Sequence, residues 1–192
     1  MADDTKLELR RKIFHICFGI LIIILAIFMQ SIKWILFFSL VLGILISILS
    51  VYRKVPIISF LLENFERPYY RKVFPGKGFL FFIAGSLLVL KLFPKETALA
   101  SIAIVTFSDP FFSFEKRTFK GILKTKKFKS ILLGFIAGTI AASFFVFPIK
   151  ALIASFSAVI IESFAIFLGA DPVDDNILVP LTAGTILYLL PF

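Results

Sequence analysis

Cysteine and acidic residues are scarce in this chain. The single cysteine, Cys17, lies inside an apolar run, which excludes an internal disulfide framework. Only 17% of the residues are charged, and 12 acids stand against 21 lysines and arginines. We find no linker, low-complexity tract or convincing internal repeat in the sequence. We therefore expect residues 1–192 to form a single domain.

Apolar residues are abundant. They make up 59% of the 192 residues and include 26 phenylalanines, and the mean hydropathy is +1.01. A water-soluble domain of this size could not bury so much apolar surface, so we expect the surrounding solvent to be lipid. The net charge of +9 is concentrated in a few short connections. That distribution is typical of an oriented membrane protein and argues against nucleic-acid binding.

The apolar segments predict an all-α, polytopic integral membrane bundle of about seven transmembrane helices. Two of the segments are short, with about 16 apolar residues where about 20 are usual. The first segment is long enough to cross a membrane and no small-residue cleavage site follows it, so a signal peptide is disfavoured. The expected spans are roughly 13–32, 34–52, 78–93, 97–114, 130–147, 151–168 and 177–192.

Two further segments flank these spans. The N-terminal MADDTKLELRRK is predicted to be an amphipathic lead-in, with Glu8 and Lys12 at helical i, i+4 spacing. The stretch PIISFLLENFERPYY predicts a short interfacial helix that ends near Pro68.

Basic residues alternate strongly between the two sides of the predicted bundle. One side holds the N-terminal Lys6, Arg10, Arg11 and Lys12, the basic residues between Arg53 and Lys77, and those between Lys116 and Lys129. The other side holds only Lys33, Lys91, Lys95 and Lys150. Because cytoplasmic loops carry the excess of lysine and arginine, the N-terminus is predicted to be cytoplasmic.

This topology places the unusual polar residues at one depth on the cytoplasmic side. They are His15, Asp109, Glu162 and the acidic cluster Asp171, Asp174 and Asp175. An ionisable residue in the hydrocarbon costs about 2.5 to 3.5 kcal/mol on insertion scales, which makes Asp109 and Glu162 functional candidates. Carboxylates beside basic loops suit Mg²⁺ with a polyphosphate. We therefore expect Asp109 and Glu162 to be metal ligands.

Simpler interpretations of the same residues remain open. His15 fits an interfacial polar residue, and Asp174-Asp175-Asn176 is a good helix N-cap. The basic loop after Asp109 could serve orientation alone. A proton relay could use the same carboxylates, but it would not need the basic loops.

Two backbone features favour phosphate binding. Pro75-Gly76-Lys77-Gly78 opens a predicted helix, where glycines let backbone amides approach an anion and Lys77 adds charge. Pro180 lies in the first turn of the last helix, where it removes a hydrogen bond and frees a carbonyl near Asn176.

Together these motifs resemble the CTP-dependent polyprenol (dolichol), phytol and diacylglycerol kinases. The opening E-x-x-R-K-x-x-H is matched by residues Glu8 to His15, and P-G-K-G by Pro75 to Gly78. Ser108-Asp109 is similar to the family's G-D, and Lys129-Ser130 to its K-S/T. Glu162 and the following DDNILVPL, residues 174–181, resemble an E followed by D-D-N-L-x-x-P-L. The matches occur in family order and cover nearly the whole chain.

The resemblance implies a lipid-alcohol kinase that transfers the γ-phosphate of CTP to a polyprenol, isoprenoid or diacylglycerol-type hydroxyl, with Mg²⁺ as cofactor. It implies catalytic roles for Asp109, His15 and Glu162. The metal ligands that it implies are Asp109, Glu162, Asp174 and Asp175. The residues implied to hold the nucleotide phosphates are Arg11, Lys12, Gly76, Lys77, Gly78, Lys129, Ser130 and Asn176. Membrane lipids are the expected surroundings, and an oligomer remains possible.

Two other classes stay open. A cytidylyltransferase that forms a CDP-lipid would also be membrane-bound and Mg²⁺-dependent. An ion-coupled carrier would use Asp109 and Glu162 for its ion, but carriers typically show inverted repeats and a midplane site.

The predicted orientation can be tested by thiol labelling. In a variant without Cys17, single cysteines between Lys116 and Lys127 should be shielded from an impermeant reagent in intact cells. A cysteine appended after Phe192 should be labelled. The reverse labelling pattern would contradict the cytoplasmic placement of Asp109, Glu162 and the Asp174-Asp175 segment.

Overall fold

The chain folds into a helical bundle. A computed structural model describes residues 2–53, 56–112, 124–163, 167–168 and 171–191. The longer helices are α1 (Ala2–Phe28), α2 (Ile32–Tyr52), α5 (Lys77–Leu92), α6 (Lys95–Phe112), α8 (Lys124–Ala142), α9 (Pro148–Ser163) and α10 (Asp175–Leu189). Two short helices, α3 (Pro56–Phe65) and α4 (Pro68–Val73), connect α2 to α5. Strands β1 (Phe167–Leu168) and β2 (Asp171–Pro172) pair antiparallel before α10.

Each predicted span corresponds to one of the longer helices, and α3 lies where the interfacial helix was expected. Several boundaries were wrong, however. Pro148 begins α9 rather than ending the helix before it, as suits a residue whose missing N–H costs nothing in a first turn. Helix α9 ends at Ser163, and residues 167–168 form a strand instead of continuing the helix.

Two of the described helices are long and apolar enough to cross a membrane, namely Lys6–Phe28 and Ile32–Tyr52. The helices α5, α9 and α10 have 16, 16 and 15 residues, which is short of the roughly 20 that usually span a bilayer. The predicted helical fold is confirmed by the helices themselves. The predicted number of membrane spans stays a prediction, because only two of the described helices meet this criterion.

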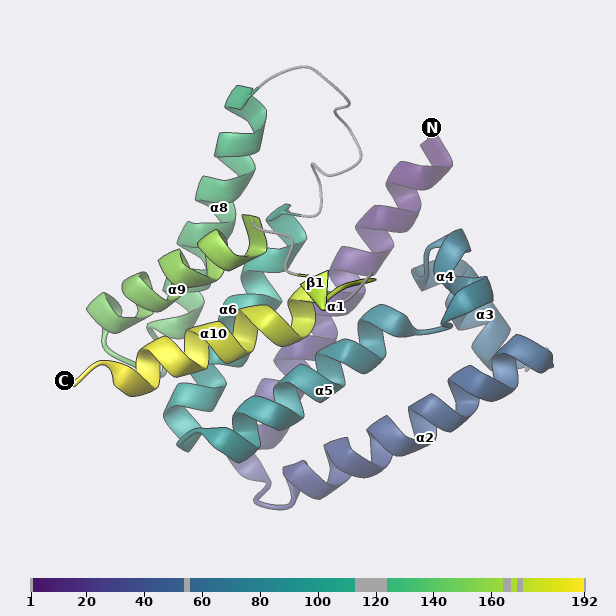
Figure 1. Cartoon of the computed structure of the whole chain (residues 1–192), viewed down its shortest axis with the longest axis horizontal. Coiled ribbons are helices and arrows are strands. Elements are labelled where there is room, and N and C mark those ends of the chain that lie inside the picture. The colour runs from purple at the N-terminus through teal and green to yellow at the C-terminus, as the bar shows by residue number, and fades with distance from the viewer. Residues whose placement is uncertain (1, 54–55, 113–123, 164–166, 169–170, 192) are drawn as a thin grey trace.

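Helix α6 lies at the centre of the bundle, packed against α1, α5, α8, α9 and α10 (Figure 1). Every residue from Ala98 to Thr106 is buried. Small side chains such as Ala98, Ala100 and Ala103 allow neighbouring backbones to approach closely. One hydrophobic cluster joins α6 to the other six longer helices. Helix α6 consequently fixes the position of Asp109, which follows this buried segment by one turn.

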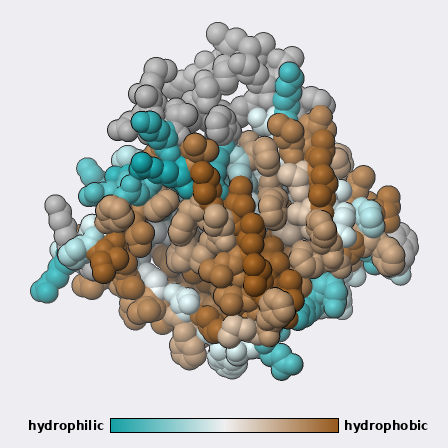
Figure 2. Space-filling view, turned by 180° about the vertical axis from the view of Figure 1, so that it is seen from behind, coloured by the Kyte–Doolittle hydropathy of each residue, from teal (hydrophilic) through white to brown (hydrophobic). Residues whose placement is uncertain are grey.

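The outer surface is strongly apolar. Helix α2 exposes Trp34, Phe38, Leu42 and Leu45, each at 58% or more, and its sequence is apolar on all sides. Figure 2 shows hydrophobic residues across the middle of one face of the molecule and hydrophilic residues toward its edges. A helix that is apolar all round and yet exposed does not fit water as its solvent.

A tight turn places the start of α5. Gly76 adopts φ 76°, a left-handed conformation that favours glycine, and it is the N-cap of α5. Ser47 of α2 donates a hydrogen bond to the carbonyl of Pro75 over 2.6 Å, which ties this turn to α2. The Pro75–Gly78 motif is therefore held between two helices.

Helices α5 and α10 touch backbone to backbone. Pro180 has no N–H, so the Asn176 carbonyl loses its usual helical donor. That carbonyl packs directly against Gly85, where a Cβ atom would collide with it. Pro180 thus leaves the Asn176 carbonyl without its helical donor, as the sequence predicted, and in the structure this carbonyl packs between α10 and α5.

Replacing Gly85 should reveal this contact. Gly85→Ala should lower the free energy of unfolding by about 1 to 3 kcal/mol, because the added methyl group overpacks a rigid backbone. Thermal unfolding of the purified protein in detergent would measure the change. Gly78→Ala is the matched control on the same helix, because nothing lies within 4 Å of its added Cβ. Equal stability of the two variants would contradict the contact.

Candidate active site

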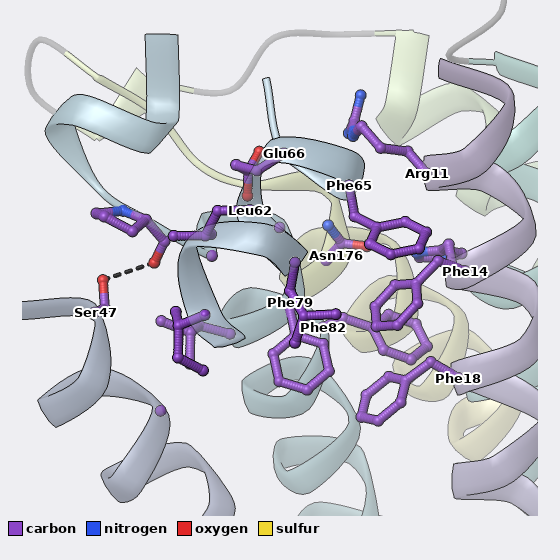
Figure 3. A pocket seen from close by; sticks show the side chains of 18 of the residues that line it. Arg11, Phe14, Phe18, Ser47, Leu62, Phe65, Glu66, Phe79, Phe82 and Asn176 are labelled. Carbon is purple, nitrogen blue, oxygen red and sulfur yellow. Dashed lines mark hydrogen bonds between the residues drawn. The ribbon is translucent and has the colours of Figure 1, made fainter. Parts of the chain in front are cut away.

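A cavity of about 270 Å³ lies beside the predicted site residues. Its walls come mainly from α1, α2, α3 and α5, with Asp109 added from α6 and Asn176 from α10. Figure 3 shows Arg11 and Glu66 together with Phe14, Phe18, Phe79 and Phe82 around this space. Charged side chains and a wall of aromatic rings therefore meet in one cavity.

Seven residues predicted from the sequence line this cavity. They come from four different helices or their caps, and their convergence is a tertiary property of the fold. They are Arg11, Lys12, His15, Gly76, Gly78, Asp109 and Asn176.

His15 and Asp109 approach each other across α1 and α6. His15 Nε2 lies 3.9 Å from Asp109 Oδ2 and 3.4 Å from the carbonyl oxygen of Val105. A carbonyl can only accept, so a hydrogen bond to it places a proton on Nε2. In the neutral ring, Nδ1 is then the acceptor. The imidazole also packs on Phe82, with ring centroids 4.5 Å apart, which restricts its orientation.

Lys12 brings a buried positive charge to the same place. Its side chain is 7% exposed, and it interacts electrostatically with Asp109 and Glu8. Arg11, the residue before Lys12, also lines the cavity. The carboxylate of Asp109 and the basic residues of the opening motif therefore lie beside the same cavity.

Ion pairs join α1 to the α3–α4 segment. Glu8 accepts from Arg11 Nη1 over 2.8 Å and from Arg67 Nε over 3.0 Å. Arg10 donates to Asn64 Oδ1 over 2.8 Å. The i, i+4 spacing placed Glu8 and Lys12 on one helix face, and the two side chains interact electrostatically. Arg67, which lies 59 residues further along the chain, is a hydrogen-bonded partner of Glu8. Only the tertiary fold brings that arginine close.

Glu66 is a cavity residue that the sequence did not single out. It is 7% exposed, and the Arg67 backbone N–H donates to its Oε1 over 3.0 Å. Burial raises the pKa of Glu66 above its ordinary value of 4.5, although Arg11, Arg67 and Arg71 oppose this shift. Glu66 lies in a short charged stretch between two helices, where a glutamate is normally exposed. The sequence around it therefore gives no sign that its side chain is buried.

Lys77 and Asp174 link the glycine loop to the start of α10. Lys77 Nζ lies 3.9 Å from Asp174 Oδ2 and 4.9 Å from the ring centroid of Tyr70. Asp174 caps α10, because its Oδ1 accepts from the backbone N–H of Asn176 over 3.1 Å. The N-cap interpretation is thus confirmed. Burial raises the pKa of Asp174, while its bonds with Asn176 and the charge of Lys77 counteract this.

Other predicted site residues do not line the cavity. Glu162 is 6% exposed near the end of α9, and Asp175 lies in the first turn of α10. Lys129 is exposed on α8, with Ser130 beside it. Glu115, Lys116, Arg117 and Lys120 lie outside the described residues.

The predicted Mg²⁺ ligands do not form a dense cluster. Within the described residues, no group of three or more His, Cys, Asp or Glu side chains is placed to hold a metal ion. Mg²⁺ that carries a polyphosphate usually takes only one or two protein carboxylates, with waters and phosphates completing its shell. Asp109 in the cavity wall is by itself compatible with that mode.

Comparison with known proteins places the chain in a family. It is 30% identical over 183 residues to "Uncharacterized protein MJ1137" of Methanocaldococcus jannaschii, which covers 94% of this chain and 92% of the relative. The chain belongs to the same family as this archaeal protein. No family model matches the chain, and no solved structure matches it either.

Glu66 should make stability depend on pH. Because its folded pKa is raised, the folded state holds the proton more tightly, and stability should fall as pH rises from about 4.5 through the folded pKa. Glu66→Gln should remove this fall and be more stable than the parent protein at neutral pH. Thermal unfolding of the two proteins at a series of pH values above 4.5 would measure this dependence of stability on pH.

Glu63→Gln provides the control, because Glu63 is an exposed carboxylate three residues away, on α3. It should leave the pH profile of the parent protein unchanged. An unchanged profile in Glu66→Gln would contradict the assigned role of burial.

Proposed function

We propose that the protein is an integral membrane lipid-alcohol kinase, which uses a nucleoside triphosphate at the cytoplasmic face. The observation that carries the proposal is the meeting of His15, Asp109 and Lys12 with a glycine-containing helix start in one cavity. The sequence resemblance favours CTP as the phosphoryl donor. It also favours a polyprenol, isoprenoid or diacylglycerol-type alcohol as the acceptor.

The proposed membrane location rests on α1 and α2. Both helices are long and apolar enough to cross a membrane, and most of α2 is exposed. In the proposed topology, seven helices lie in the bilayer with the N-terminus on the cytoplasmic side. Arg11, Lys77 and the α3–α4 arginines then face the side on which nucleotides are available.

The proposed chemistry relies on positioning and charge. Phosphoryl transfer needs groups that hold the phosphates in line and neutralise their charge. Arg11, Lys12, Lys77 and Lys129 supply positive charge, and Ser130 supplies a hydroxyl donor. The backbone at Gly76 and Gly78 lies at the start of α5, where a helix favours anions.

Mg²⁺, when bound, would neutralise phosphate charge at Asp109, Glu162, Asp174 or Asp175. His15 accepts the proton of the attacking hydroxyl in this proposal. The contact of Nε2 with the Val105 carbonyl leaves Nδ1 as the ring nitrogen that would accept this proton. Asp109 beside it would stabilise the positive charge that the ring then acquires.

A label-transfer experiment tests the proposed function. Purified protein in liposomes would receive Mg²⁺, a mixture of lipid alcohols, and CTP labelled at the γ or the α phosphate. Parallel reactions would contain ATP or GTP. We expect the γ label on lipid together with release of CDP. An α label on lipid with release of pyrophosphate would instead identify a cytidylyltransferase, and no transfer from any triphosphate would refute the kinase.

Nearly isosteric variants provide the matched controls for this assay. Asp109→Asn should lower turnover by about 100-fold or more, because it deletes a charge at the reacting centre. Glu63→Gln removes an exposed carboxylate and should retain turnover. Near-normal turnover of Asp109→Asn would remove that residue from the catalytic set.

A further inference from the structure

The cavity is too small to enclose both substrates of a lipid kinase. Its volume of about 270 Å³ is slightly below the range of roughly 300 to 1,000 Å³ that encloses a drug-sized ligand. It can therefore receive only part of one substrate. The chemistry of its wall should indicate which part.

Most of the wall is aromatic and aliphatic. The ring centroids of Phe18 and Phe79 lie 4.5 Å apart, and those of Phe14 and Phe65 lie 5.0 Å apart. Because these rings pack on one another, they form a continuous apolar wall rather than a slot for stacking a base. Figure 3 shows Phe18, Phe79 and Phe82 on one side of the cavity and Arg11 and Glu66 on the other. An amphipathic ligand fits this division.

Asn176 supplies an acceptor that distinguishes a hydroxyl from a phosphate. Its Nδ2 donates to Asp174 Oδ1 over 2.9 Å, and that contact fixes the amide orientation because a carboxylate oxygen accepts. Asn176 Oδ1 is buried and has no hydrogen-bond partner among the described residues. An alcohol O–H can donate to this oxygen, whereas an ionised phosphate oxygen would repel it.

The cavity also lies beside helices that face the proposed membrane. Gly43, Ile46 and Ser47 of α2 line it, while Leu42 and Leu45 of the same helix are exposed. Helices α1 and α2 diverge from their connecting turn (Figure 1), and α3 contributes Leu62 to the wall between them. A lipid in the bilayer would therefore lie next to the helices that form the cavity wall.

We propose that this cavity is the acceptor subsite, which binds the hydroxyl end and the first part of the chain of a lipid alcohol. The inference rests on the proposed function and deepens it. It assigns Asn176 to the alcohol hydroxyl rather than to the nucleotide phosphates. The phenylalanine wall and Leu62 hold the adjoining hydrocarbon, and the rest of the chain remains in the membrane.

Photolabelling without nucleotide tests this subsite independently of phosphoryl transfer. The probe is a long-chain isoprenoid alcohol with a diazirine near its hydroxyl, and the comparison is its methyl ether, which has no O–H donor. In liposomes, the alcohol should label cavity residues such as Phe65 and Phe79 about fivefold more than the ether does. Excess unlabelled alcohol should compete.

Two variants and one control complete the test. Leu62→Trp fills the cavity and should reduce this labelling about tenfold. Asn176→Ala should abolish the preference for the alcohol over the ether, and it provides a second result if Leu62→Trp does not fold. Leu42→Trp, on the exposed face of α2, should label normally.

The two proposals fail in different ways. Specific alcohol labelling without γ-phosphate transfer would refute the kinase but retain the alcohol subsite. Labelling by the alcohol confined to the exposed face of α2, or labelling of Phe65 and Phe79 by a photoreactive CTP instead, would overturn the subsite even in an active kinase. Equal labelling by alcohol and ether would also overturn it.

Discussion

Close packing around the buried helix α6 is the constraint on which the rest of the structure depends. From Ala98 to Thr106 no residue is more than 4% exposed, so neighbouring helices enclose α6 on all sides. Small side chains permit this contact, and Thr106 packs directly on Gly19 of α1. Because α1 and α6 are held so closely, His15 and Asp109 meet at the same level of the bundle.

The electrostatics of the cavity follow from that packing. Lys12 and Asp109 interact within a largely buried setting, while Glu8 and Arg67 join α1 to the α3–α4 segment. Glu66 and Asp174 are acids whose pKa values are raised by burial despite nearby cations. Glu66 lines the cavity, and a carboxyl group whose pKa is perturbed beside a cavity is typical of functional sites. Glu66 shares the cavity with Gly76, and Asp174 pairs with the neighbouring Lys77.

The aromatic wall gives the cavity a second chemical character. Phe14, Phe18 and Phe79 lie along one side, and Asn176 presents a buried acceptor. A lipid alcohol combines these requirements, since its hydroxyl donates and its chain is apolar. A nucleotide would bring its charges to the basic residues at the opposite edge. In the proposed function, the alcohol thus occupies the cavity and the nucleotide phosphates lie at its basic edge.

The sequence by itself determined the helical class, the approximate positions of the seven longer helices and the cap at Asp174. Those features depend on local hydrophobic runs and local hydrogen bonds. Only the tertiary structure decided that His15 and Asp109 approach while Glu162 lies outside the cavity, because these contacts join residues far apart in the chain. The pairing of Glu8 with Arg67, the burial of Glu66 and the contact of Gly85 with Asn176 depend on helix packing. No periodic pattern within one helix records which neighbour it will face.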